Sequence, residues 1–244
     1  MAHYQVKIAY DGTQFFGFQR QGSARTVQSE FETALLELKW QGKSILCAGR
    51  TDTGVHASGQ VVSFHLDWKH GCETLQKALN VKLPKDIAVN EVSVVEEGFH
   101  PRYDAKFRSY RYRIYCQAGR NPLRDRFAWR VWPSVDLDLL QLAAASIIGT
   151  HDFSAFGKAP QIGGHTVRTV LKTEWLKSDD DQFDFMIQAN AFLYHMVRRL
   201  VFVQVKIGQK LWEIEEFVSG IENQSEQLPG LAKPNGLTLV EVQY

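Results

Sequence analysis

Apolar and polar residues alternate along several short stretches of residues 1–98, and this period of two predicts β-strands. The predicted strands are Tyr4–Tyr10, Ser44–Ala48, Gln60–Leu66 and Ile87–Val95. A helical period predicts two helices, one from the N-cap Thr26 to about Trp40 and one over Glu73–Val81. The resulting order β-α-β-β-α-β is typical of a mainly antiparallel sheet covered by helices.

Residues 99–244 show a comparable order of elements. The predicted strands are Lys106–Tyr115, Val167–Leu176, Phe183–Ala189 and Leu237–Tyr244, with a turn at Ser178–Asp181. The predicted helices run from Ser134 or Asp136 to Ile148 with Gly149 at the C′ position, over Phe192–Lys206, and over Glu213–Ile221. Two such series indicate an α/β (α+β) chain with two halves, residues 1–98 and residues 99–244. The cleft between the halves is the expected ligand site.

The composition is that of a globular protein, because 44% of the 244 residues are hydrophobic and 23% are charged. Three isolated cysteines without a CxxC pair argue against a disulfide framework or a cysteine-rich zinc site and favour a reducing cytosol. The N-terminus lacks an apolar signal region, and no run reaches the ~18 apolar residues of a membrane helix. We therefore expect a cytoplasmic protein with no membrane partner.

Charge is distributed unevenly, although the formal net charge is only +1. Nine Lys and Arg residues against two Asp residues lie between Phe99 and Trp132, which gives this segment a net charge of +7. Five Glu and no Lys or Arg lie between Trp212 and Gln227. This asymmetry predicts one basic working surface, which would line the cleft, and one solvated acidic segment.

The densest group of reactive side chains lies in Ala48–Ala57, between two predicted strands. Asp52 is the only strong nucleophile there, since the loop has no second carboxylate, Ser-His pair or metal-ligand spacing. A lone carboxylate cannot use the two-carboxylate route of glycoside hydrolysis, but it can attack a sugar C1′ or a pyrimidine ring and later be expelled. Arg50, two residues earlier on an extended chain, would keep it ionised. In the alternative interpretation, Asp52 and Gly54 only form a turn.

Two histidines near these motifs are less suited to catalysis. His56 follows Gly-Val at a strand edge, where a structural hydrogen bond is the more common role. His195 belongs to a predicted helix with no second metal ligand at useful spacing, so we interpret it as structural or as an RNA contact. Neither histidine predicts a metal site.

Cations and tyrosines alternate along the predicted strand Arg108–Tyr115. Side chains two residues apart share a face, so Arg108, Tyr110 and Tyr112 lie on one face and Arg111 lies on the other. In one interpretation these are ordinary cross-strand pairs on a sheet surface. In the other they form a stacking platform interleaved with phosphate-binding guanidinium groups, as in RNA-binding proteins. The surrounding positive charge favours the second interpretation.

Motifs of one known family occur in order along nearly the whole chain. They are Tyr10-Asp11-Gly12-Thr13, Phe16-Gly17-Phe18-Gln19, Arg25-Thr26-Val27-Gln28, Gly49-Arg50-Thr51-Asp52-Thr53-Gly54-Val55-His56-Ala57, Phe99-His100-Pro101-Arg102, Tyr110-Arg111-Tyr112, Gly149-Thr150-His151-Asp152-Phe153, Ala191-Phe192-Leu193, His195-Met196-Val197-Arg198 and Gly236-Leu237-Thr238-Leu239. With these motifs the chain resembles the tRNA pseudouridine synthase A family.

This resemblance implies the pseudouridine synthase fold, with two ferredoxin-like halves and a central cleft. It implies conversion of uridine to pseudouridine at positions 38, 39 and 40 of the tRNA anticodon stem-loop, without a cofactor or metal. It also implies a homodimer in which each tRNA contacts both subunits. Asp52 corresponds to the nucleophile, Arg50 to its ion-pair partner and Tyr110 to the ring that stacks on the target uracil. Arg198 and Leu237 resemble the remaining wall of the active site.

The chain departs from the family pattern at four positions. Phe202 stands where glycine is common on the long helix, and Lys233 replaces a proline before Pro234. Pro101 and Asp104 alter the usual Phe-His-Ala-Arg segment. These departures bear on helix packing and on the range of tRNA positions modified.

The first chemical step stays open, since Asp52 could attack C1′, attack C6 or remove a ribose proton, and in each case the target base must first leave the stack. Two other function classes also fit the residues. One is an RNA-binding or tRNA-folding protein in which the Asp52 loop is only a turn. The other is an N-glycosidase that uses Asp52 covalently and releases uracil.

Overall fold

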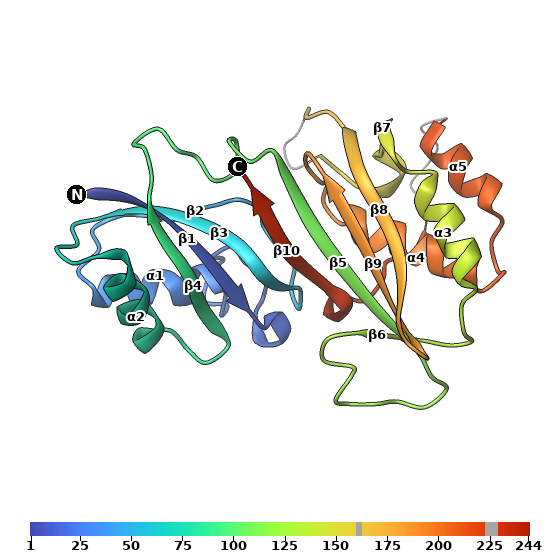
Figure 1. The fold of residues 1–244 in the computed structure, drawn as a ribbon, viewed down its shortest axis with the longest axis horizontal. Helices are drawn as coiled ribbons and strands as arrows, with labels where there is room; N and C mark the ends of the chain where they lie inside the picture. Colours follow the sequence, from blue (N-terminus) through green and yellow to red (C-terminus); the bar gives the residue numbers. More distant parts are fainter. Residues whose placement is uncertain (160–162, 223–228) are drawn as a thin grey trace. The chain divides into compact units, whose positions relative to one another are not determined.

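The computed structural model describes residues 1–159, 163–222 and 229–244, which belong to two compact units (Figure 1). The first unit contains residues 1–106 and 238–244, and the second contains residues 107–237. The chain thus enters the second unit after Lys106, whereas the sequence suggested a division between residues 98 and 99. The C-terminal strand belongs mainly to the first unit.

The first unit is a sheet with helices on one face. Its elements are β1 (Ala2–Tyr10), a 3-10 turn η1 (Gly12–Gln14), α1 (Val27–Glu37), β2 (Leu46–Cys47), β3 (His56–Leu66), α2 (Cys72–Lys82), β4 (Ile87–Val94) and β10 (Leu237–Gln243). The strand order is β4-β1-β3-β10. Strand β10 pairs with His56 and Ala57 at the start of β3, and β2 pairs with Val62 and Ser63 further along the same strand. All pairs are antiparallel except β3 with β10. This sequence of elements confirms the predicted β-α-β-β-α-β order.

The helices of this unit are held by the burial of their apolar faces. The ring centroids of Phe31 in α1 and Phe64 in β3 are 5.9 Å apart. Val6 and Ile8 of the neighbouring strand β1 are fully buried. Thr26 is the N-cap of α1, as predicted, and forms a reciprocal capping box with Ser29. The helix ends at Glu37 rather than near Trp40.

The second unit is a four-stranded antiparallel sheet with an additional short strand. Its elements are β5 (Phe107–Cys116), β6 (Trp129–Val131), α3 (Leu137–Ala145), β7 (Gly149–Asp152), η2 (Ser154–Phe156), β8 (Val167–Asp179), β9 (Gln182–Ala189), α4 (Met196–Gly208), α5 (Ile214–Glu222) and η3 (Pro234–Gly236). The strand order is β5-β9-β8-β7, with β6 parallel to β5. The fold is therefore α/β with mostly antiparallel strands, as predicted.

Helices α3 and α4 cover one face of this sheet. Trp175 of β8 is fully buried, and its indole N–H donates to Gln204 of α4 at 2.7 Å. Thr173 of the same face donates to the main-chain oxygen of Ala144 in α3 at 2.7 Å. The predicted β8–β9 hairpin and the predicted acidic helix α5 are both confirmed.

Several predicted boundaries were wrong for local reasons. Helix α3 ends at Ala145 with Ser146 as its C-cap, so Gly149, with φ of +112°, is not the C′ residue but opens β7. Helix α4 begins at Met196 rather than Phe192, because His195 has a left-handed φ of +67°. Strands β6 and β7 are too short to show a period and were not predicted.

Phe202, the departure on the long helix, is accommodated by its surroundings. Its ring stacks on Trp129 at 6.2 Å and meets Trp212 edge-on at 6.1 Å. A Cβ on Gly230 would lie 2.0 Å from this ring, so the glycine leaves the space that Phe202 fills. Helix α4 continues through this position without interruption.

No helix in the described part of the chain is long and apolar enough to cross a membrane.

Candidate active site

Asp52 lies in the loop that connects β2 to β3 in the first unit. The start of this loop is tied to β3, since Ala48 N–H donates to Val61 O at 2.9 Å and the Gln60 side chain donates to Gly49 O at 2.6 Å. Within the loop, Val55 N–H donates to the main-chain oxygen of Asp52 at 3.1 Å. The loop is therefore a turn, but this hydrogen bond of the turn uses the main chain of Asp52 and not its carboxylate.

Gly54 has the positive φ of +77° that the turn interpretation requires. The two interpretations of the loop are compatible, because the hydrogen bond from Val55 N–H that closes the turn engages the main chain of Asp52.

A second loop, from Gly12 to Phe18, packs against the Asp52 loop. Phe18 N–H donates to Thr51 O at 3.0 Å, and Gly54 N–H donates to Phe15 O at 3.3 Å. The Tyr10 hydroxyl forms a 2.7 Å hydrogen bond with the Thr51 hydroxyl. The residue before Asp52 and the turn after it are therefore both fixed by main-chain contacts.

Two glycines allow this close approach. A Cβ on Gly12 would lie 2.0 Å from the carbonyl oxygen of Val55. A Cβ on Gly17, whose φ is +84°, would lie 2.8 Å from the carbonyl oxygen of Thr51 and 3.3 Å from the carbonyl carbon of Asp52. Sequence reasoning used these glycines only as family motifs and missed this role, because the contact joins segments about 40 residues apart.

His56 has the structural role that the sequence suggested. It is buried, and its Nδ1 accepts the main-chain N–H of Gly12 at 3.0 Å. Asp11 Oδ1 lies 3.2 Å from the same nitrogen. The imidazole thus adds a third link between the two loops.

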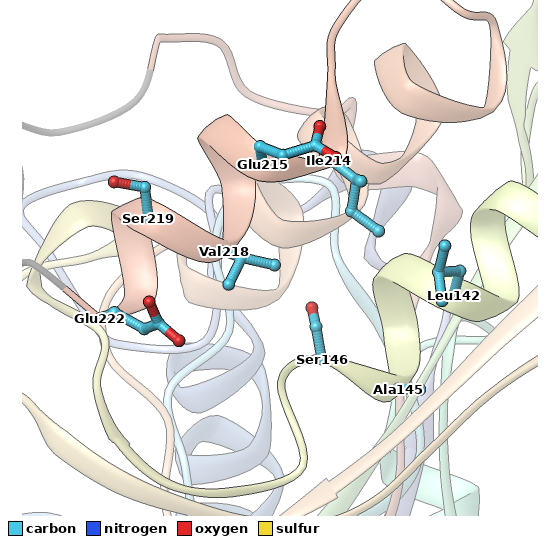
Figure 2. A pocket seen from close by; sticks show the side chains of 8 residues that line it. All are labelled: Leu142, Ala145, Ser146, Ile214, Glu215, Val218, Ser219 and Glu222. Carbon is cyan, nitrogen blue, oxygen red and sulfur yellow. The ribbon is translucent and has the colours of Figure 1, made fainter.

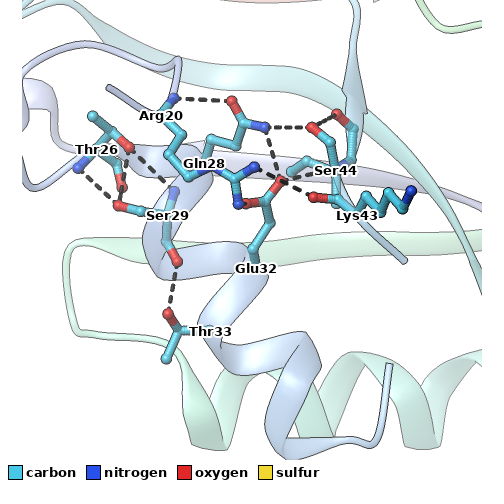
Figure 3. Close-up of polar contacts among 9 residues, drawn as sticks. Arg20, Thr26, Gln28, Ser29, Glu32, Thr33, Lys43 and Ser44 are labelled. Carbon is cyan, nitrogen blue, oxygen red and sulfur yellow. Dashed lines mark hydrogen bonds and ion pairs between the residues drawn. The ribbon is translucent and has the colours of Figure 1, made fainter. Parts of the chain in front are cut away.

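A buried polar network connects the second loop to helix α1 (Figure 3). Gln28 N–H donates to Phe18 O at 2.9 Å, and the Gln28 side chain accepts from Arg20 N–H at 2.9 Å. Glu32, only 3% exposed, accepts from Gln28 at 2.8 Å and from the Arg20 guanidinium at 2.7 Å. It also accepts from Ile45 N–H at 3.1 Å, just before β2. The same buried carboxylate therefore links the segment after the second loop to the segment before β2.

Arg50 is exposed on the Asp52 loop. Its cation and that of Arg102 lie near the Cys47 thiol, where they oppose the effect of burial, which raises the pKa of Cys47 to about 11. The expected ion pair between Arg50 and Asp52 stays a prediction.

Tyr110, Arg198 and Leu237 belong to the second unit. Tyr110 lies on β5, is 8% exposed and meets the ring of Phe192 edge-on at 4.9 Å. Arg198 is in the first turn of α4 and donates from Nε to Ala232 O at 2.8 Å. Leu237 follows η3 and is almost buried. The segment 232–237 thus links the last two of these residues.

Tyr112 was wrongly included in the stacking platform. It is fully buried, burial raises the pKa of its phenol, and its hydroxyl donates to Lys233 O at 2.6 Å. It is a core residue, whereas Arg111 lies half-exposed on the opposite face. Because the hydrogen bond uses the main chain of Lys233, the departure from proline at that position does not alter it.

Two cations of the basic segment are neutralised by carboxylates from outside it. Arg113 forms a bidentate pair with Asp184 at 2.8 and 3.0 Å. Arg124 forms another with Asp181 at 2.8 and 2.9 Å and lies over the Tyr115 ring. The positive charge that this segment can offer to a ligand is therefore smaller than +7. Arg120 and Arg126 are among the exposed cations of the segment.

Within residues 1–159, 163–222 and 229–244, no group of three or more His, Cys, Asp or Glu side chains could hold a metal ion.

The family model described as tRNA pseudouridine synthase matches residues 7–104 and 143–244. Two relatives named tRNA pseudouridine synthase A, from Streptococcus pneumoniae strains P1031 and 70585, are each 37% identical over 247 residues, covering 100% of this chain and 99% of the relative. The chain belongs to the tRNA pseudouridine synthase family, an isomerase family that converts uridine to pseudouridine in RNA.

Among solved structures, a chain of the archaeal box H/ACA sRNP Nop10–Cbf5 complex aligns with a TM-score of 0.34 and 10% identity. The alignment covers 83% of this chain and 44% of that chain. A likeness at this level adds nothing to the family assignment, which rests on the sequence matches.

Replacement of Gly12 by Ala tests the contact between the two loops. We expect the free energy of unfolding to fall by about 1–3 kcal/mol, since the added methyl group would collide with the Val55 carbonyl. Urea unfolding of both proteins measures the difference. Gly98→Ala is the matched control, because no atom lies within 4 Å of its Cβ position. Equal effects of the two substitutions would contradict the role assigned to Gly12.

Proposed function

We propose that this protein isomerises uridine at positions 38, 39 and 40 of the tRNA anticodon stem-loop, with Asp52 as the nucleophile. The observation that carries the assignment of Asp52 is the geometry of its loop. The neighbouring main-chain groups are held by Gly12–Phe18, and the turn is closed through the main chain of Asp52 itself. Such a loop presents a carboxylate in a defined position, which nucleophilic catalysis requires.

The reaction is an exchange of bonds within one nucleotide. The N1–C1′ bond breaks, the uracil rotates, a C5–C1′ bond forms, the C5 hydrogen leaves as a proton, and N1 receives a proton. The target uridine must first leave the base stack, because the carboxylate cannot reach it inside a duplex. Asp52 acts by attack at C1′, by attack at C6 or by removal of a ribose proton, and each route begins at the same carboxylate.

The other site residues receive distinct roles in this proposal. Arg50 is the ion-pair partner of Asp52, and Tyr110 stacks on the target uracil while the Phe192 ring limits its orientation. Arg198 and Leu237 form the remaining wall, and the hydrogen bond of Arg198 to Ala232 O restricts the direction of its guanidinium. The roles come from the family resemblance, and the local contacts are consistent with them.

The proposed partner is tRNA, bound through phosphate contacts with the exposed cations of the segment from Phe99 to Trp132. Affinity should therefore fall steeply as salt rises. A homodimer is proposed on the family resemblance. A cytoplasmic location is proposed because tRNA is the substrate and the three cysteines are free thiols.

Asp52→Asn tests the nucleophile. We expect the release of tritium from [5-³H]uridine-labelled tRNA to fall by roughly 10³-fold or more, since the nucleophile itself is lost. Filter binding should show nearly unchanged tRNA affinity. Asp67→Asn is the control, because it removes an exposed carboxylate from the same unit.

The competing functions give different results in the same assay. An RNA-binding or tRNA-folding protein would release no tritium even as the wild type, and this outcome would reject the enzyme proposal. An N-glycosidase would leave free uracil, which chromatography of the products detects. Carbodiimide primer extension on the treated tRNA identifies the modified positions and would reject positions 38–40 if the signals lay elsewhere.

Tyr110→Ala and Tyr110→Phe separate the ring from the hydroxyl. Stacking of a base on an aromatic ring contributes about 1–3 kcal/mol, so the alanine variant should lose roughly 5- to 150-fold in turnover. The phenylalanine variant keeps the ring and should be clearly faster than the alanine variant. Equal losses in single-turnover assays would reject stacking and assign the role to the phenol.

A further inference from the structure

A pair of stacked aromatic rings lies in the second unit, directly before helix α4. The ring centroids of Tyr194 and His195 are 3.7 Å apart, and the two planes meet at 26°. Tyr194 is 56% exposed, although Leu193 before it is buried. A large part of the Tyr194 ring is therefore open to a ligand. Neither ring has a part in the proposed isomerisation.

The main chain holds Tyr194 in a defined position. Its N–H donates to Lys158 O at 3.0 Å in an isolated antiparallel bridge. Gly157 allows this approach, because a Cβ there would lie 2.7 Å from Tyr194 O. His195 has φ of +67° and ψ of 0°, a left-handed conformation that is uncommon outside glycine and that clusters at ligand sites. The exposed ring is thus carried by a main chain of fixed conformation.

The aromatic pair continues the surface that begins at the proposed uracil-stacking ring. Phe192 meets the Tyr110 ring edge-on at 4.9 Å. Phe192 and Tyr194 flank the buried Leu193, as expected for an extended segment in which alternate side chains share a side. Two residues of extended chain span at most about 7 Å. Neighbouring nucleotides of one RNA strand can therefore reach Tyr110 and Tyr194 together.

The charge around the aromatic pair is positive. Lys158 is exposed and lies opposite Tyr194 in the antiparallel bridge, so the two side chains share a face. Between Asn190 and Lys206 there are three Lys or Arg and no Asp or Glu. The pKa of Arg199 is lowered by burial and by the neighbouring cation of Arg198, a repulsion that a bound phosphate would relieve. Aromatic rings beside cations are the usual means of binding single-stranded RNA.

We propose that Tyr194, backed by His195, stacks on the base next to the target uridine, and that Lys158 binds a phosphate of the same strand. The inference rests on the proposed function, since it adds a second contact with the same RNA. A uridine that leaves the stack deprives its neighbour of a stacking partner, and the Tyr194 ring replaces that partner. Tyr194 is thus a substrate-binding residue.

Tyr194→Ala and Tyr194→Phe test the ring in the tritium-release assay. Loss of a base–aromatic stack weakens binding by about 5- to 150-fold, so KM of the alanine variant should rise by that factor. Its kcat should change by less than about threefold, because binding of substrate is lost and not chemistry. The phenylalanine variant keeps the ring and should have nearly the wild-type KM.

Leu142→Ala is the matched control for the loss of an exposed apolar side chain. Leu142 is 55% exposed and lines a small apolar groove between α3 and α5 that contains neither ring (Figure 2). This variant should keep the wild-type KM and kcat.

A tRNA that lacks the neighbouring base separates stacking from a structural effect. The substrates are full-length tRNAs with the target uridine at position 39 and an abasic nucleotide at position 38 or 40. Wild-type protein should bind at least one of them about 5- to 150-fold more weakly than intact tRNA. Tyr194→Ala should show no further loss with that tRNA, because the two changes remove the same contact. Losses that multiply would overturn the proposal.

Lys158→Gln tests the phosphate contact. Removal of one cation–phosphate contact should make the plot of log K against log salt concentration shallower by about one unit. Lys210→Gln is the control with the same change in charge. Lys210 follows the other end of α4, and its ammonium lies 3.4 Å from Asp136. An equal salt dependence of wild type and Lys158→Gln would overturn this contact.

Failure of the stack differs from failure of the enzyme. Wild-type protein that releases no tritium would reject the isomerase and this inference together. Normal tritium release with an unchanged KM in Tyr194→Ala would reject the stack alone, as would equal losses in the alanine and phenylalanine variants. A shift from dimer to monomer caused by Tyr194→Ala in sedimentation velocity would assign the ring to a second copy and overturn the proposal. If the alanine variant fails to fold, Tyr194→Leu, which keeps apolar volume, replaces it in every comparison.

Discussion

The approach of two main chains in the first unit is the constraint on which the proposed site depends. At Gly12 and Gly17 one loop lies against the carbonyl groups of Val55 and Thr51. The main chains are so close that a Cβ atom at either position would collide with these carbonyl oxygens. Hydrogen bonds then fix the Asp52 loop through its main chain. The surrounding structure meets the cost of ordering this loop, so the fold fixes the main chain that carries Asp52.

The rigidity of this arrangement extends into the core through helix α1. Glu32 is a buried carboxylate, and a buried charge is tolerated only when donors satisfy it. Its donors come from Arg20, Gln28 and Ile45, which belong to the loop before α1, to α1 itself and to the segment before β2. One carboxylate thus joins these three segments of the first unit.

Charge has different roles in different parts of the second unit. Arg113 and Arg124 pair with carboxylates of the β8–β9 hairpin, so these two cations serve the fold. The acidic segment was expected to be a solvated surface. The structure bears this out, since Glu213, Glu215, Glu216 and Glu222 are exposed, and helix α5 also contributes Ile214 and Val218 to a small apolar groove. Net charge counted along the sequence therefore overstates the basic surface and overlooks the groove.

The sequence alone determined the order of the main strands and helices, the loop that carries Asp52, and the family. Periodicity and capping depend on residues close together in the chain, and Thr26 shows how well they predict a helix start. Only the tertiary structure decided that Tyr112 is buried in the core and that the short strands β6 and β7 pair with the longer strands β5 and β8. It likewise decided that α4 begins after His195. It also decided why Gly12 and Gly17 are needed. Burial and close approach depend on distant segments that pack together, and no local pattern records them.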